Sequence, residues 1–336
     1  FGSRKQFGSS RYGAANFTLR IDSTMSVHFD TADFLALDGL MTFLRSAGSF
    51  QVFLAEDDWQ QSASKRLVAV CGNWYDRRKA PALAMAARDE DADVFLTGGR
   101  EERLTPGDAV DLGGEPLLLR QVLCSEFDVH PKRLILYTGS RVTNHNLLAV
   151  LHYAKQLHEF TQCTVSLTIV EEGFLIRREA AALSKMLADD AAAASIVAEV
   201  RFVAVGAKSF VDLVDTHGGR ADIALALAVG ELDRLQRYKS AGSMTTSTHG
   251  RVHHGALLDQ TLASGDSTLH TTMASVRERH ADLIAGGMRI LQELPRGEML
   301  ALASPVVNSL RSALFTAGII ASSFAVAIML RSKSTR

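Results

Sequence analysis

Short runs of apolar residues alternate with longer stretches of helical periodicity through the middle of the chain. Runs of this length and composition, closed by Gly, Thr or charged residues, are typical of buried strands. Five strands are predicted, at residues 67–71, 93–97, 133–137, 164–170 and 200–205. Helices are predicted beginning at Thr31 and over residues 80–88, 117–127, 143–157, 174–187 and 223–238. The alternation predicts an α/β fold, a Rossmann-like parallel sheet of about five strands with helices on both faces.

Composition divides the chain into further parts. Residues 1–29 form a basic extension that is rich in Ser and Gly and has no acid before Asp22, like the remnant of an organellar targeting segment. A simple basic tail is the alternative. Residues 30–240 carry the α/β pattern, and residues 241–270, rich in Ser, Thr and His, are expected to form a linker. An amphipathic helix is predicted over residues 271–295 as a C-terminal helical extension.

A transmembrane helix is predicted over residues 310–331, because no charged residue occurs from Ser312 to Leu330. A helix of that length spans roughly 28 Å, close to the thickness of a bilayer core. A buried core helix is the alternative. Basic residues flank the stretch on both sides, so they leave its orientation open.

Small residues recur along one face of this stretch, and small residues allow transmembrane helices to pack closely. They are Ala317, Gly318, Ala321, Ser322 and Ala325. We therefore expect contact with other membrane subunits as well as with the lipid bilayer, although a helix that only anchors the chain would also fit.

Charge and cysteine content narrow the functional classes. The formal net charge of -1 and pI near 6.9 give no general attraction to nucleic acid, so no nucleic-acid partner is expected. Cys71, Cys124 and Cys163 lie far apart in apolar stretches, which favours a reducing compartment and buried, inert thiols. The chain has no GxSxG, Walker or GxGxxG motif, and its histidines offer no convincing metal site.

Ligands of parallel α/β folds bind beyond the carboxyl ends of the strands, so the residues that follow each predicted strand are the candidates for chemistry. Glycines and hydroxyl residues prevail there. Glu171 and Glu172 also follow a strand, but adjacent loop residues usually point apart, and we expect solvent exposure for both.

The order of these motifs resembles that of the YdcF-like family, a bacterial group of uncharacterised α/β domains, over about residues 30–238. The matching features are Gly72, then Thr97, Gly98 and Gly99, then Glu115, then SRVTNHN over residues 140–146, then Arg177 and Arg178. The chain departs from the family at Val142, where the family has Asn, and at His145, where it has Glu.

The resemblance implies a pocket for S-adenosylmethionine or a nucleotide, whereas no required cofactor follows from the residues themselves. The candidate cofactor-binding residues are Gly72, Asn73, Gly98, Gly99, Glu115, Ser140, Thr143, Asn146 and Arg177. Because His145 replaces a carboxylate that could act as a base, the sequence favours a vestigial pocket over an enzyme, and we name no catalytic or metal-binding residue.

Together these features predict a structural role. The expected protein is a membrane-anchored YdcF-like accessory subunit of a complex in the mitochondrial inner membrane, of the kind that an ATP synthase or a respiratory complex represents. The side of the membrane that holds the globular part is open. The alternative is a membrane-tethered enzyme or sensor that binds S-adenosylmethionine or a nucleotide.

Overall fold

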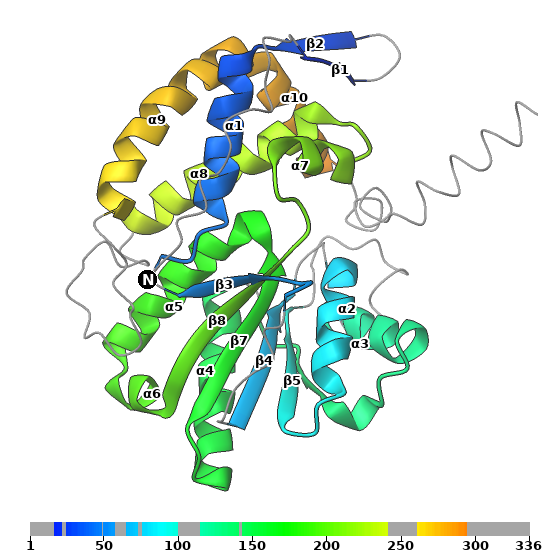
Figure 1. The fold of residues 1–336 in the computed structure, drawn as a ribbon, viewed down its shortest axis with the longest axis vertical. Coiled ribbons are helices and arrows are strands. Elements are labelled where there is room, and N and C mark those ends of the chain that lie inside the picture. The colour runs from blue at the N-terminus through cyan, green and yellow to red at the C-terminus, as the bar shows by residue number, and fades with distance from the viewer. Residues whose placement is uncertain are drawn as a thin grey trace, which may run out of the picture.

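A computed structural model describes residues 17–21, 25–48, 50–57, 65–72, 76–99, 115–140, 143–240 and 261–293 (Figure 1). A six-stranded, wholly parallel sheet forms its centre, with the strand order β3-β8-β7-β4-β5-β6. The strands are β3 (Gln51–Leu54), β4 (Lys65–Cys71), β5 (Ala92–Thr97), β6 (Leu134–Tyr137), β7 (Val165–Glu172) and β8 (Val197–Val205). The protein is therefore an α/β protein with a single parallel sheet.

The two faces of the sheet are covered by different helices because side chains alternate along each strand. Val68 and Val70 of β4 pack with α2 (Asp76–Ala87) and α3 (Glu115–Glu126). Leu67 and Ala69 of the same strand point the other way, into a core with α4 (Thr143–Thr161) and α5 (Ile176–Asp189), close to α6 (Ala191–Ile196). Helices on both faces were predicted, and this part of the prediction is confirmed.

The sheet has six strands rather than the five predicted. The extra strand, β3, pairs with β8 at the edge of the sheet. It has four residues, and Gln51 and Val52 are exposed, so it lacks the apolar run that marks the buried strands. Short edge strands are half solvated, and their sequences therefore carry a weak signal.

A group of helices lies beyond the carboxyl ends of β7 and β8 (Figure 1). Their shared core includes the short segments that follow these two strands. The helices are α1 (Thr31–Leu44), α7 (Phe210–Thr216), α8 (Ala221–Ser240), α9 (Thr261–Arg279) and α10 (Ala281–Glu293). We refer to them as the helical cap.

The C-terminal part of the cap differs from the sequence prediction. Helix α9 begins at Thr261, inside the predicted linker, and His280 separates α9 from α10 where one helix over residues 271–295 was expected. Met273 and Val276 of α9 are fully buried in the same core as α1 and α8. Tertiary packing therefore holds a helix together where the local composition, rich in Ser and Thr, disfavours one.

The extension at residues 1–29 also contains structure. Strands β1 (Phe17–Ile21) and β2 (Met25–Phe29) form an antiparallel pair. The side chain of Phe29 is fully buried against Phe34 and Phe210, so the end of this pair belongs to the cap core.

None of the described helices is long and apolar enough to cross a membrane. The predicted transmembrane segment, residues 310–331, lies outside the described residues, as does its face of small residues.

Candidate functional site

The strand order reverses between β4 and β7, because the chain continues outward from β4 to β5 and β6 and then returns to β7 and β8. The carboxyl ends of the strands at such a switch point form the crevice where parallel α/β folds bind ligands. Cys71 ends β4 there and is followed by Gly72, and Glu171 and Glu172 end β7. Charged side chains from α2, α5 and α8 meet these strand ends in what we call the switch-point cluster.

Lys79 occupies the centre of the switch-point cluster. Its side chain is fully buried, donates a hydrogen bond to the carbonyl oxygen of Cys71 at 2.8 Å and pairs with Glu171 Oε1 at 2.7 Å. Glu171 Oε1 also accepts a hydrogen bond from the backbone N–H of Glu172 at 2.7 Å. Helix α2 carries Lys79 because it starts directly beyond β4 and runs back along the sheet.

Glu179, one turn into α5, shares a hydrogen bond with Glu171. Burial raises the pKa of the Glu179 carboxyl well above its usual range, and the nearby charge of Glu171 raises it further. Two carboxyl groups in contact cannot both ionise at low cost, so the contact with Glu171 disfavours the charged form of Glu179.

Glu172 lies on the other side of the cluster. Its side chain is fully buried, and Arg78 on α2 donates to Oε1 at 3.4 Å. Burial raises the pKa of Glu172 to about 7, although Arg78 opposes the shift. Gly206, after β8, has φ +76 and leaves room for this carboxyl group, because a Cβ at residue 206 would overlap Glu172 Oε2.

Arg178 connects the cluster to α4 and to the cap. It donates to Thr143 Oγ1 at 3.0 Å and lies 2.7 Å from Glu231 Oε1 on α8. The geometry of the second contact makes it an ion pair rather than an aligned hydrogen bond. Glu231 is fully buried and also pairs with Arg234 at 3.0 Å, and the carboxylates around Arg178 raise the pKa of its guanidinium.

The glycine turns form a second feature, next to the cluster on the β5 side. The carboxyl group of Glu115, at the start of α3, lies against both Gly72 and Gly98: a Cβ at Gly72 would be 2.8 Å from Glu115 Oε2, and one at Gly98 would be 2.9 Å from it. Gly98 also accepts a hydrogen bond from Ser140 N at 3.1 Å. The structure thus brings together Gly72, Gly98, Glu115 and Ser140, all of which the sequence singled out.

Other predicted site residues lie apart from the cluster or contact it only indirectly. Arg177 turns toward α1, where it donates to Ser46 Oγ and to the Phe43 carbonyl oxygen at 3.3 Å and stacks over the Phe43 ring. Asn146 is buried in α4 with Oδ1 lacking a hydrogen-bond partner among the described residues. Gly99 accepts from Glu115 N at 3.4 Å, Thr143 meets Arg178, and Asn73 lies outside the described residues.

Two sequence predictions about polar residues were wrong. Glu171 and Glu172 are fully buried, not exposed, because β7 continues through both residues and is covered on both faces. Cys163 is exposed just after α4, whereas Cys71 is buried, and burial raises the pKa of its thiol. The sequence also did not show that the adjacent Arg177 and Arg178 point in different directions. Arg178 points into the switch-point cluster, whereas Arg177 points toward α1.

Sequence reasoning also missed Lys79, Glu179 and Glu231. Each lies on a helix among apolar residues. A charged residue on an otherwise apolar helical face could have indicated a buried charge at these three positions. Ion pairing explains their grouping: Lys79 pairs with Glu171, Arg78 with Glu172, and both Arg178 and Arg234 with Glu231. Burial is the main cause of the raised pKa values of Glu172 and Glu179.

The comparisons with known proteins add no relative. No protein-family model matches the chain, and a search of curated proteins finds no match. The fold and the switch-point cluster define a parallel α/β protein with a buried network of ion pairs at the position where such folds bind ligands. Any narrower assignment is a proposal.

Proposed function

We propose that this chain is a YdcF-like accessory subunit of a complex in the mitochondrial inner membrane, anchored by residues 310–331, and that its ancestral small-molecule site now has a structural role. The observation that carries the structural part is the internal neutralisation of the switch-point cluster. Lys79 pairs with Glu171, Arg78 with Glu172 and Arg178 with Glu231. A site built for a charged ligand keeps its charged groups for that ligand, whereas these groups are matched to one another.

Two further observations support the loss of the site. The carboxyl group of Glu115 lies in the notch between Gly72 and Gly98, where a backbone approach by a ligand would otherwise be possible. The guanidinium of Arg177, the candidate for binding a ligand's anionic group, is bound to α1 instead.

The membrane part of the proposal rests on the sequence. Residues 312–330 are free of charge, and Ala317, Ala321 and Ala325 recur at four-residue spacing beside Gly318 and Ser322, which favours packing against the helices of other subunits. The basic, acid-poor composition of residues 1–21 favours a mitochondrial location.

Extraction and native electrophoresis of mitochondrial membranes test the proposal. The chain is expected to stay in the membrane pellet after carbonate washing and to migrate, after mild detergent treatment, with one large complex such as an ATP synthase or a respiratory complex. Replacing Ala317, Ala321 and Ala325 together with Leu should release the chain from that complex but not from the membrane. Migration of the unaltered chain only as a free monomer would reject the proposal.

A second candidate function is favoured by one specific observation. Glu172 and Glu179 each have a buried carboxyl oxygen without a hydrogen-bond partner among the described residues, and both have raised pKa values at the switch point. Such groups are typical of functional sites. Under this alternative the chain is a membrane-tethered enzyme or sensor that binds S-adenosylmethionine or a nucleotide. Calorimetric titration with S-adenosylmethionine and with ATP separates the two, since saturable binding that Glu172→Gln abolishes would favour the second.

A further inference from the structure

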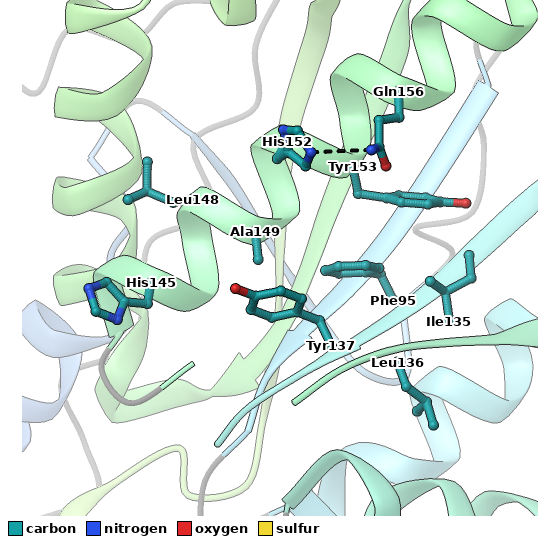
Figure 2. Close-up of a pocket in the computed structure, with 10 residues that line it drawn as sticks. All are labelled: Phe95, Ile135, Leu136, Tyr137, His145, Leu148, Ala149, His152, Tyr153 and Gln156. Carbon is teal, nitrogen blue, oxygen red and sulfur yellow. Dashed lines mark hydrogen bonds between the residues drawn. The ribbon is translucent and has the colours of Figure 1, made fainter. Parts of the chain in front are cut away.

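A groove that opens to solvent lies between α4 and the outer strands β5 and β6, away from the switch point (Figure 2). Its volume is about 730 Å³, within the range of roughly 300–1,000 Å³ that is usual for small-molecule sites. None of the ten residues that line the groove belongs to the switch-point cluster, so we treat the groove as a separate site.

One wall of the groove is a continuous face of α4. His145, Leu148, Ala149, His152 and Tyr153 recur at intervals of three and four residues, which places them on one side of the helix. This wall is solvated in the described structure, and the side chain of Leu148 is 52% exposed.

Three aromatic rings line the groove where α4 meets the strands: Tyr153 on α4, Phe95 on β5 and Tyr137 on β6. The rings of Tyr153 and Phe95 are stacked with centroids 4.9 Å apart, and those of Phe95 and Tyr137 with centroids 6.5 Å apart. The Tyr153 hydroxyl is held by Asp93 at 3.1 Å. Tyr137 remains 41% exposed, and Figure 2 shows Ala149 on α4 pointing toward its ring. The smallest side chain of the α4 wall thus faces the most exposed of the three rings.

The polar groups of the groove define the charge of its ligand. His145, His152 and Gln156 lie along the helix side, with His152 Nε2 and Gln156 Nε2 3.2 Å apart, and none of the ten lining residues is Lys, Arg, Asp or Glu. The lining therefore offers a charged ligand no Lys, Arg, Asp or Glu side chain as an ionic partner. Imidazole, amide and hydroxyl groups instead suit the hydrogen-bonding edge of a neutral ring.

We propose that this groove binds a neutral, flat, fused-ring heteroaromatic group, such as the base of a nucleoside or a flavin-type ring, stacked on the exposed Tyr137 ring beside Ala149. His145 and His152 would then contact its polar edge. His145 is one of the two positions where the chain departs from the YdcF-like pattern, so the departure places an imidazole instead of a carboxylate at the rim of this groove. The inference does not depend on the accessory role proposed above.

Calorimetric titration of the full chain in detergent with adenosine and with riboflavin tests this site. At least one of the two is expected to bind saturably at a single site, and Ala149→Leu, which fills the space beside Tyr137, should weaken that binding about tenfold or more. Glu159→Leu adds the same side chain at an exposed position of α4 outside the groove and should leave binding unchanged.

A second variant keeps the test decisive if Ala149→Leu does not fold. Tyr137→Leu removes an exposed ring from the edge strand and should also weaken binding about tenfold. Absence of saturable binding for both compounds would overturn the proposal, as would equal affinity of the unaltered chain and a folded Ala149→Leu or Tyr137→Leu variant.

Discussion

Buried charges at the switch point determine how individual residues affect stability. Both side chains of the Lys79–Glu171 ion pair are fully buried. Removing one partner of such a pair leaves the other as an uncompensated buried charge. Replacing both partners with neutral residues leaves no uncompensated charge, so the double substitution should destabilise the protein much less. Lys79 and Glu171 therefore offer the clearest test of whether the cluster is a coupled unit.

Replacing Lys79 with Met should lower the free energy of unfolding by about 3–5 kcal/mol, because Glu171 would lose its ammonium partner. The double variant Lys79→Met with Glu171→Gln should lose much less than the sum of the two single variants. Urea unfolding of the four proteins measures the coupling. Strictly additive effects would show that Lys79 and Glu171 contribute independently.

Glu172 makes stability depend on pH in the direction opposite to that of an ordinary surface carboxylate. Its pKa is about 7 in the folded protein against 4.5 for the free side chain, so the folded state binds the proton more tightly. Its contribution is fully present below pH 4.5 and is lost as the pH rises through about 7, by about 3 kcal/mol in total. Glu172→Gln should therefore gain stability relative to the unaltered chain between pH 5 and pH 8.

The difference between the two proteins is the quantity to measure, because His217 contributes an opposite slope. Burial lowers the pKa of His217 to about 4, which adds stability as the pH rises toward 6.5 in both proteins. Glu126→Gln, which removes an exposed partner of Arg77, is the matched control and should show no such trend. A constant difference between the Glu172→Gln variant and the unaltered chain across this pH range would contradict the burial of an ionisable Glu172.

At the scale of elements, the cap depends on a close approach of α10 to α8. A Cβ at Gly287 would overlap the carbonyl oxygen of Asp222, whereas one at the adjacent Gly286 would meet nothing within 4 Å. The two glycines occupy the same helix and differ in their surroundings. Substituting each glycine in turn therefore compares the cost of a packing overlap with the gain in helix propensity.

Gly287→Ala should lower the free energy of unfolding by about 1–3 kcal/mol, because α10 must move away from α8. Gly286→Ala should raise it by up to about 1 kcal/mol, because Ala favours a helix over Gly and nothing opposes its methyl group. Thermal unfolding of both variants measures these effects. An equal response of the two variants would mean that α10 does not pack on α8 as described.

The elements also show what the sequence could predict. The buried strands at residues 67–71, 93–97 and 164–170 are recognisable because a parallel strand covered on both faces must be continuously apolar. Edge strand β3 and helix α9 are not, since the first is half solvated and the second is held by contacts of Met273 and Val276 with distant helices. Local patterns do not record those contacts.

Only those residues of the candidate site could be predicted whose type is required by the backbone geometry, such as the glycines at strand ends. Gly72 and Gly98 mark strand ends that pack against Glu115, and their sequence positions revealed them. Lys79, Glu179 and Glu231 come from three separate helices, and their meeting depends on the strand order. The orientation of Arg177 and Arg178 depends on the cap, which the sequence pattern did not locate.

At the scale of the whole molecule, residues 261–293 are part of the globular unit. Asp33 on α1 accepts hydrogen bonds from Arg279 and from His280 Nε2 at 2.9 Å, and the His280 ring lies 4.5 Å from that of Phe29. The predicted boundary at residue 240 therefore does not separate two independent units. Residues 261–293 instead belong to the helical cap.

Cleavage at a protease site inserted near residue 250 tests this arrangement in the chain. The two fragments should stay together in size-exclusion chromatography, because α9 and α10 bury apolar side chains against α1 and α8. The same cleavage in a Met273→Asp variant should release the C-terminal fragment. Separation of the fragments without that substitution would show that the C-terminal helices are not docked.

The proposed role of this globular unit is that of an accessory subunit in a membrane complex. Electron cryomicroscopy of particles purified through a tag on this chain examines that role most directly. We expect density for the six-stranded sheet and its cap beside other subunits, with a helix over residues 312–330 inside the detergent belt and packed through Ala317, Ala321 and Ala325. Particles that contain this chain alone, with that segment outside the belt, would contradict the proposed role.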